Sequence, residues 1–327
     1  MFNVRFSEGG EYPFSYVYKN SEILLKKYNF LDSDKVLFYG FNSTLETEAI
    51  ESLKKLNKKN YYICHAGMSS IFDNSYEERN KNLKKFDVVA FSNRIRAEWE
   101  NNFFEKKIKF IHSNFPIEHS SYSKFDSISM EDKKHDIIYS GFIHSNFHID
   151  FLKIMKKYNY IFTSLYKQSP THLAKFNLLA PIFFRPEFLS YEQMLLKQAQ
   201  SKISICSNVM YLNKDQYKKI LGMKYIDRFP NFNEVLKQKI LPEFKGRLFE
   251  LPITKTLMLV HRDPWNIIED YFEPEKDFIY FHNLKDLNHK IRLILNNYQD
   301  YWPIVLSAYE KIKTFTNKKM LEKLSTF

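Results

Sequence analysis

Short apolar runs alternate with helix-like segments along the whole chain, and this alternation constrains the fold more than any other feature of the sequence. The runs are rich in Val, Ile, Phe and Tyr, as buried strands are. We expect strands at Asn3–Ser7, Lys35–Gly40, Tyr61–His65, Asp87–Ser92, Ile108–Ser113, Asp136–Gly141, Tyr160–Leu165, Lys202–Asn208, Thr256–His261 and Phe278–His282. Strands that alternate with helical segments are typical of parallel sheets covered by helices. The pattern therefore predicts an α/β protein with two similar halves.

Two of the intervening segments carry helix start signals. Ser43 and Glu46 form a capping box, and Asn283 and Asp286 have the same spacing. Apolar residues follow both signals at helical spacing, namely Leu45, Ala49, Leu53 and Leu56 in the first segment and Leu287, Ile291, Ile294 and Leu295 in the second. Each helix thus has one apolar face and should pack on a sheet.

A stretch rich in serine and charge, IEHSSYSKFDSISMEDKKHD, separates the two halves and has no hydrophobic periodicity. Its composition is that of an interdomain linker. We place the boundary near Lys134, which gives domains at residues 1–133 and 134–327. In the second half, the proline-containing segment Gln168–Tyr191 looks like a loop, and Tyr211–Leu241 looks like an irregular insertion.

The chain is basic, because 49 Lys and Arg residues exceed 38 Asp and Glu residues and give a formal net charge of +11. This charge favours anionic partners, such as a nucleotide, a membrane surface or a nucleic acid. However, the lysines are scattered through stretches such as SLKKLNKKN, which are typical of solvated helix faces. No motif of aromatic and basic residues for nucleic acid accompanies them, so we predict no nucleic-acid partner.

The cysteines and the apolar runs bear on the compartment. Cys64 and Cys206 lie far apart within apolar segments, which favours buried free thiols in a reducing environment over a disulfide. No run reaches the ~18 apolar residues of a membrane span. The beginning MFNVRFSEGG lacks the plan of a signal peptide. We therefore expect a cytoplasmic protein, and the basic charge also allows peripheral contact with the inner face of a membrane.

Several common catalytic motifs are absent. Only seven glycines occur, and neither GxGxxG nor GxxxxGK[ST] is present, so a nicotinamide site or a P-loop would lack its phosphate-binding backbone. HExxH, zinc-spaced cysteine pairs and the GxSxG elbow are also missing. The sequence thus disfavours dehydrogenases, kinases, metallohydrolases and serine esterases, and we predict neither a cofactor nor a metal.

Candidate functional residues lie where predicted strands end, because open α/β sheets bind ligands beyond the carboxyl ends of their strands. His65 ends a predicted strand and precedes Gly67. A histidine there could hydrogen bond a hydroxyl-rich ligand or move a proton, although a structural histidine is the alternative. Gly141 ends the first predicted strand of the second half.

The segment KGRLFELPITKTLMLVH is the most informative. Arg247 and Glu250 are three residues apart, which places them on one face of a helix that follows Gly246. A guanidinium can hold a phosphate and a carboxylate can accept hydrogen bonds from vicinal ribose hydroxyls. The pair therefore suggests a nucleotide site, and an ordinary intrahelical salt bridge is the alternative.

The order of motifs in the second half carries a resemblance to a known family. These motifs are DIIYSG, AQSKISICSN, RLFE, TLMLVH, NIIEDYF, KDFIYF, LKDLNHKIRLILNN and YWPIVLSAYEKI, over roughly residues 135–315. In this order they resemble the nucleotide-sugar-binding half of group 1 glycosyltransferases of the GT-B architecture, especially the spore-maturation type. The first half resembles the acceptor half of that family more loosely, through YYICHAGMSS, FDVVAFSNRIRAEW and KIKFIHSNFPI.

The resemblance implies a fold and a function. The fold would be two Rossmann-like domains facing each other across a cleft, with the last helix returning toward the first domain. The function would be transfer of a hexosyl or related group from a nucleotide sugar to a glycan or lipid-linked acceptor, without a metal. Gly141, Arg247 and Glu250 would bind the donor. A non-catalytic sugar-nucleotide or glycan-binding protein of the same fold is the alternative.

The resemblance also implies catalytic residues. His65 matches the family histidine at the acceptor side of the cleft, and a base for the acceptor hydroxyl is expected among His65, Glu8 and Asp73. The sequence departs from the family at two points. The usual Arg and Lys pair after the glycine of DIIYSG is missing, and Glu243 is separated from Glu250 by six residues instead of seven. These departures leave retention or inversion at the anomeric carbon open.

Overall fold

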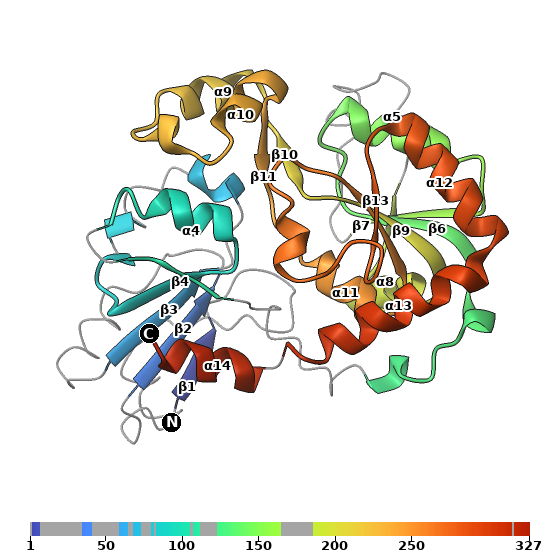
Figure 1. The fold of residues 1–327 in the computed structure, drawn as a ribbon, viewed down its shortest axis with the longest axis horizontal. Helices are drawn as coiled ribbons and strands as arrows, with labels where there is room; N and C mark the ends of the chain where they lie inside the picture. Colours follow the sequence, from blue (N-terminus) through green and yellow to red (C-terminus); the bar gives the residue numbers. More distant parts are fainter. Residues whose placement is uncertain are drawn as a thin grey trace. The chain divides into compact units, whose positions relative to one another are not determined.

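The computed structural model describes residues 2–6, 35–40, 59–64, 68–72, 80–81, 83–104, 107–111, 123–164, 186–315 and 317–327. The chain forms two compact units (Figure 1). Unit 1 consists of Met1–Pro116, Leu212–Phe244 and Asn317–Phe327, and unit 2 consists of Ile117–Tyr211 and Lys245–Thr316. This division differs from a single boundary near Lys134, since two later segments cluster with the first unit.

Unit 1 contains a five-stranded parallel sheet in the order β1-β2-β3-β4-β5. Its strands are β1 (Phe2–Phe6), β2 (Lys35–Gly40), β3 (Lys59–Cys64), β4 (Val88–Phe91) and β5 (Lys109–Phe110). The 3-10 helix η2 (Met68–Phe72) and the α-helix α4 (Arg94–Glu100) belong to this unit. The last helix, α14 (Asn317–Ser325), belongs to this unit (Figure 1). Its Met320 and Leu324 pack against Tyr61 of β3 and Ala90 of β4.

The segment 212–244 of unit 1 is helical, so the expectation of an irregular insertion was wrong. It forms α9 (Lys214–Leu221), η5 (Ile226–Arg228), α10 (Phe232–Gln238) and the short strand β11 (Ile240–Pro242). The helix α9 begins at a capping box between Asn213 and Gln216, a signal that is readable in the sequence.

An aromatic contact anchors this insertion to α4. Trp99 is completely buried, and its indole Nε1 donates a hydrogen bond to the Tyr225 carbonyl at 3.0 Å. The Trp99 ring also meets Phe229 edge-on at 5.4 Å. The other end of the insertion is held by Glu243, whose carboxylate accepts hydrogen bonds from the Ser69 backbone N–H and from Ser69 Oγ, each at 3.2 Å.

Unit 2 contains a six-stranded parallel sheet in the order β13-β12-β9-β6-β7-β8. Its strands are β6 (His135–Ser140), β7 (Tyr160–Ser164), β8 (Glu187–Phe188), β9 (Ser201–Ser207), β12 (Leu257–His261) and β13 (Ile279–Phe281). The chain passes outward from β6 through β7 to β8 and then returns to place β9 on the other side of β6. The strand order reverses between β6 and β9, which is the position where sheets of this kind bind ligands.

Helices cover both faces of the unit 2 sheet (Figure 1). They are α5 (Asn146–Met155), α8 (Tyr191–Ala199), α11 (Arg247–Ile253), α12 (Leu284–Asn296) and α13 (Tyr298–Ile312), with the short elements η4 (Met130–Asp132), β10 (Val209–Tyr211) and η6 (Ile267–Asp270). Apolar side chains of α5, α12 and α13 form one continuous core with β6, β9, β12 and β13.

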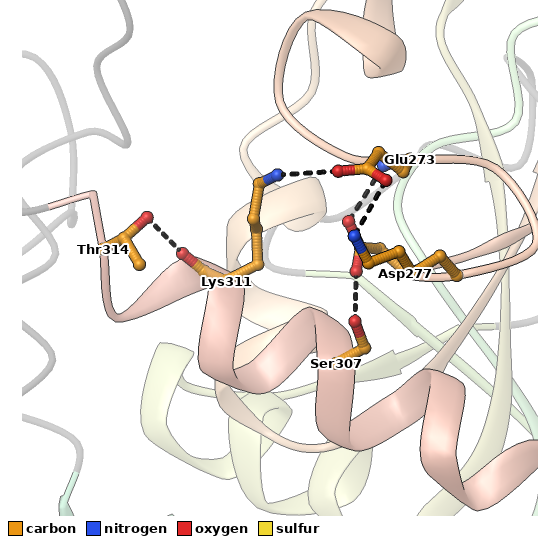
Figure 2. A network of polar contacts seen from close by, with 6 residues as sticks. Glu273, Asp277, Ser307, Lys311 and Thr314 are labelled. Carbon is orange, nitrogen blue, oxygen red and sulfur yellow. Dashed lines mark hydrogen bonds and ion pairs between the residues drawn. The ribbon is translucent and has the colours of Figure 1, made fainter.

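Polar contacts tie α13 to the turn before β13. Ser307 Oγ donates to Asp277 Oδ1 at 2.6 Å, and the second oxygen of Asp277 accepts from the Glu273 backbone N–H at 2.9 Å (Figure 2). Lys311 Nζ donates a hydrogen bond to Glu273 Oε1 at 3.4 Å. At the end of the helix, Thr314 Oγ1 donates a hydrogen bond to the Lys311 carbonyl at 2.8 Å. This network, together with the apolar core, fixes α13 within unit 2.

The sequence predictions can be compared with these elements. All ten predicted strands are present, with ends shifted by a few residues and with β5 reduced to Lys109–Phe110. The predicted start of α12 is confirmed, since the Asn283 side chain accepts from the Asp286 N–H. Cys206 is a buried free thiol, as predicted. The helix predicted after Ser43 lies outside the described residues.

The predicted linker is packed where the structure describes it. Phe125 is buried, and Lys255 Nζ donates to the carbonyls of Asp126 and Ile128 at 2.5 and 3.0 Å. The buried Lys133 amine donates to the carbonyl of Ala199, at the end of α8. Residues 123–133 therefore belong structurally to unit 2, because their polar and charged side chains find partners there.

Candidate functional site

Gly141 follows β6 at the carboxyl edge of the unit 2 sheet and has a φ of +151°, a conformation that favours glycine. A Cβ atom at this position would lie 2.1 Å from Arg247 Nη2. The guanidinium therefore lies directly against the Gly141 backbone, at the place where the strand order reverses. Only a residue without a side chain allows this approach.

Arg247 is the first residue of α11, which begins after Gly246 as the sequence predicts. Its guanidinium lies over the Tyr139 ring, 5.1 Å from the centroid. The Tyr139 hydroxyl donates to the Phe142 carbonyl at 2.8 Å, which orients the ring. Arg247 is thus held by a backbone surface and an aromatic face.

Glu250 lies one turn along α11 and is only 7% exposed. Burial raises the pKa of its carboxyl group, and Arg247 acts in the opposite direction. Within the described part of the chain, no ion pair within 4.0 Å joins the two side chains. The arrangement is therefore not the simple intrahelical salt bridge that the spacing also allowed, and the charges of both residues are not neutralised by direct contact.

A buried histidine adds to this site from α5. His148 is 4% exposed, and its Nδ1 is hydrogen bonded to Ser145 Oγ at 2.7 Å. Burial lowers the pKa of His148 well below its ordinary value, and the nearby His144, Lys245 and Arg247 lower it further. These groups therefore surround a neutral imidazole, and the site as a whole favours anions.

The structure brings the three predicted donor-binding residues into one region of unit 2. Gly141 and Arg247 are in contact, and Glu250 follows on the same helix. The predicted catalytic residues His65, Glu8 and Asp73 lie outside the described residues. Glu243, considered as an offset family glutamate, instead bonds Ser69 in unit 1.

Sequence reasoning did not select Lys245 or His148. The lysine precedes the glycine of the KGRLFE motif, and the histidine lies in the first turn of α5, four residues after His144, which precedes the helix. The approach of Lys245 and Arg247 to His148 depends on the tertiary packing of α5 and α11 at one sheet edge, which the linear sequence does not reveal.

The described residues contain neither a cluster of metal ligands nor a membrane-spanning helix. Among them, no group of three or more His, Cys, Asp or Glu residues could hold a metal ion. None of the helices in the described ranges is sufficiently long and apolar to cross a membrane.

Comparisons with known proteins bear on the family and the fold. Residues 194–324, which include α11 and most of the helices of unit 2, match a family model described as glycosyl transferase-like. Among solved structures, Anabaena HepE in complex with UDP-glucose has a TM-score of 0.59 at 10% identity, over 94% of this chain and 82% of that one. The fold is GT-B. The predicted architecture of two Rossmann-like domains is thereby confirmed.

Two further GT-B structures are similar. TarM from S. aureus matches with a TM-score of 0.55 at 16% identity, over 94% of this chain and 57% of TarM. Sucrose-phosphate synthase from Thermosynechococcus elongatus matches with a TM-score of 0.55 at 10% identity, over 97% and 80%. The chain thus spans little more than half of TarM but most of the other two. No curated protein matches the sequence.

Proposed function

We propose that the protein is a glycosyltransferase that moves a sugar from a nucleotide sugar to a glycan or lipid-linked acceptor, and that unit 2 binds the nucleotide. The observation that carries this proposal is the guanidinium of Arg247 held against the Gly141 backbone at the switch point of the sheet. A partly exposed cation at this position suits a diphosphate, which Arg can bond bidentately.

Different residues of the site would bind different parts of the nucleotide. Lys245 and Arg247 supply positive charge for the diphosphate, and the neutral His148 lies in the same region. Glu250 supplies a carboxylate that can accept hydrogen bonds from the two ribose hydroxyls. The glycosyl transferase-like match of residues 194–324 supports glycosyl transfer from a nucleotide sugar, and so do the UDP-glucose complex of HepE and the UDP and GlcNAc complex of the pneumococcal O-GlcNAc transferase GtfA.

The reaction forms a bond between the acceptor oxygen and the anomeric carbon and breaks the bond from that carbon to the diphosphate. The negative charge that develops on the leaving diphosphate would be stabilised by Arg247 and Lys245. In an inverting reaction, a base takes the proton of the acceptor hydroxyl, and His65, Glu8 and Asp73 remain the predicted candidates. The net charge of +11 favours contact with an anionic membrane surface where a lipid-linked acceptor would lie.

The proposal is tested by titration calorimetry with UDP, GDP, dTDP and CMP and their sugars, followed by an assay for donor hydrolysis or transfer. We expect at least one nucleotide sugar to bind and to be turned over. Glu250→Gln should weaken nucleotide binding, whereas Glu310→Gln, on the exposed face of α13, should not. Binding without turnover would indicate a sugar-nucleotide-binding protein instead, and binding of no nucleotide would contradict both functions.

A further inference from the structure

Asn208 follows β9 directly and presents an unsatisfied amide at the edge of the unit 2 sheet. The residue is completely buried, yet neither Oδ1 nor Nδ2 has a hydrogen-bond partner among the described residues. The neighbouring Ser207 Oγ is also buried and unpaired, as is Nδ1 of His261, which is the register partner of Ser207 on β12. Buried polar atoms without partners are uncommon, and here several gather at the carboxyl ends of two adjacent strands.

The alternation of side chains along β9 indicates which face of the sheet Asn208 shares. Residues two apart point to the same face, so Asn208 should follow Cys206. Cys206 lies within electrostatic range of Arg247 and Glu250. We therefore place Asn208 on the same face of the sheet as α11, two residues beyond Cys206 and at the carboxyl end of β9.

The unpaired carboxamide of Asn208 is suited to binding hydroxyl groups. A buried donor or acceptor that stays unpaired costs on the order of 1–3 kcal/mol, so an apolar residue of similar size would be more stable in the empty protein. A carboxamide places a donor beside an acceptor without adding charge. Two vicinal hydroxyls match this arrangement, whereas a diphosphate binds better to the cations Lys245 and Arg247.

We propose that Asn208 is a ligand-binding residue that hydrogen bonds the hydroxyl groups of the nucleotide sugar. This proposal rests on the proposed function. The hydroxyls can come from the ribose or from the transferred sugar, and the choice of titrant separates these two sources.

The test uses Asn208→Leu, which removes the amide and keeps the branched shape of the side chain. Because the unpaired groups are lost, the unliganded protein should melt about 2–4 °C higher than the wild type. The affinity for UDP-glucose should fall about 10-fold, since a hydrogen bond of roughly 1.4 kcal/mol is lost. Asn208→Ala provides the same binding test if the leucine does not fit. The matched control is Asn233→Leu on the exposed surface of α10, which should leave the affinity unchanged.

The same titrations locate the hydroxyls. An equal loss of affinity for UDP and for UDP-glucose assigns Asn208 to the ribose, and a loss for UDP-glucose alone assigns it to the transferred sugar. Wild-type affinities for both ligands in Asn208→Leu or Asn208→Ala would overturn the proposal for Asn208 alone. If the wild-type protein binds no nucleotide, the proposed function fails as well, so the two failures are distinguishable.

Discussion

Two helices, one in each unit, carry an arginine in their first turn and a glutamate about one turn later, four residues on in α4 and three in α11, but they use these residues differently. In α4, Arg96 and Glu100 are both completely buried, and the guanidinium contacts the carboxylate at 3.0 Å through Nε and Nη2. Arg96 Nη1 also donates to Ser70 Oγ at 2.7 Å. The α4 pair is thus a closed ion pair that links α4 to η2.

In α11, the corresponding groups are kept apart. Arg247 lies on the Gly141 backbone and on the Tyr139 ring, and no carboxylate of the described residues lies within 4.0 Å of it in an ion pair. An arginine and a glutamate about one turn apart on a helix therefore do not by themselves imply an ion pair between them. The two arginines differ in what they contact. Arg96 contacts Glu100, whereas Arg247 of α11 lies against the backbone of Gly141, a glycine with positive φ after β6.

The largest expected effect concerns the closed pair. Arg96→Met should lower the free energy of unfolding by about 3–5 kcal/mol, because the Glu100 carboxylate would be left buried without its cation. Arg247→Met should cost clearly less, because no direct ion pair is broken. Urea unfolding of both variants measures the difference. Equal losses would show that the two arginines have the same structural role, and the double variant Arg96→Met/Glu100→Leu should recover much of the first loss.

A smaller effect is expected at Gly141. Gly141→Ala should destabilise unit 2 by about 1–3 kcal/mol, because the backbone is at a φ that other residues avoid and the new Cβ would displace Arg247. Gly222→Ala, at the end of α9, is the matched control, since its Cβ would meet only ordinary contacts, the nearest at 3.6 Å. Thermal unfolding of the two variants measures the effect. If Gly141→Ala is as stable as Gly222→Ala, the close approach of Arg247 is not required by the fold.

The smallest effect concerns pH and His148. The folded protein holds the pKa of His148 well below that of the unfolded chain, so His148 favours folding above pH 6.5 and this contribution is lost as the pH falls. The loss should reach at most about 2 kcal/mol between pH 6.5 and pH 5. His148→Asn keeps a hydrogen-bonding group near Ser145 but cannot titrate, so its stability should fall less over this range. Parallel pH profiles of the wild type and the variant would contradict a lowered pKa of His148 in the folded protein.

Much of this fold could be predicted from the sequence, because strands and amphipathic helices are encoded locally. The apolar runs located ten of the thirteen strands in the described residues and missed only the short strands β8, β10 and β11. The spacing of Asn283 and Asp286 located the beginning of α12. The helix after Gly246 was predicted with Arg247 and Glu250 on it, since the two residues are close in sequence.

Other features could not be predicted, because they depend on contacts between distant segments. The attachment of the insertion to α4 requires Trp99 to meet Tyr225, 126 residues later. The contact of Arg247 with Gly141 depends in the same way on α11 packing at the end of β6. For Asn208, the sequence predicted the end of a strand but not that its amide is buried without partners.

If Arg247 of α11 binds the nucleotide, its replacement should weaken the binding of UDP, and titration calorimetry with UDP measures this loss. Arg247→Met should bind UDP at least about 10-fold more weakly than the wild type, because a charge-assisted hydrogen bond contributes roughly 1.5–3 kcal/mol. Arg292→Met, which changes an exposed arginine of α12, should bind UDP as the wild type does. The same UDP affinity in the wild type, Arg247→Met and Arg292→Met would contradict a role of Arg247 in nucleotide binding.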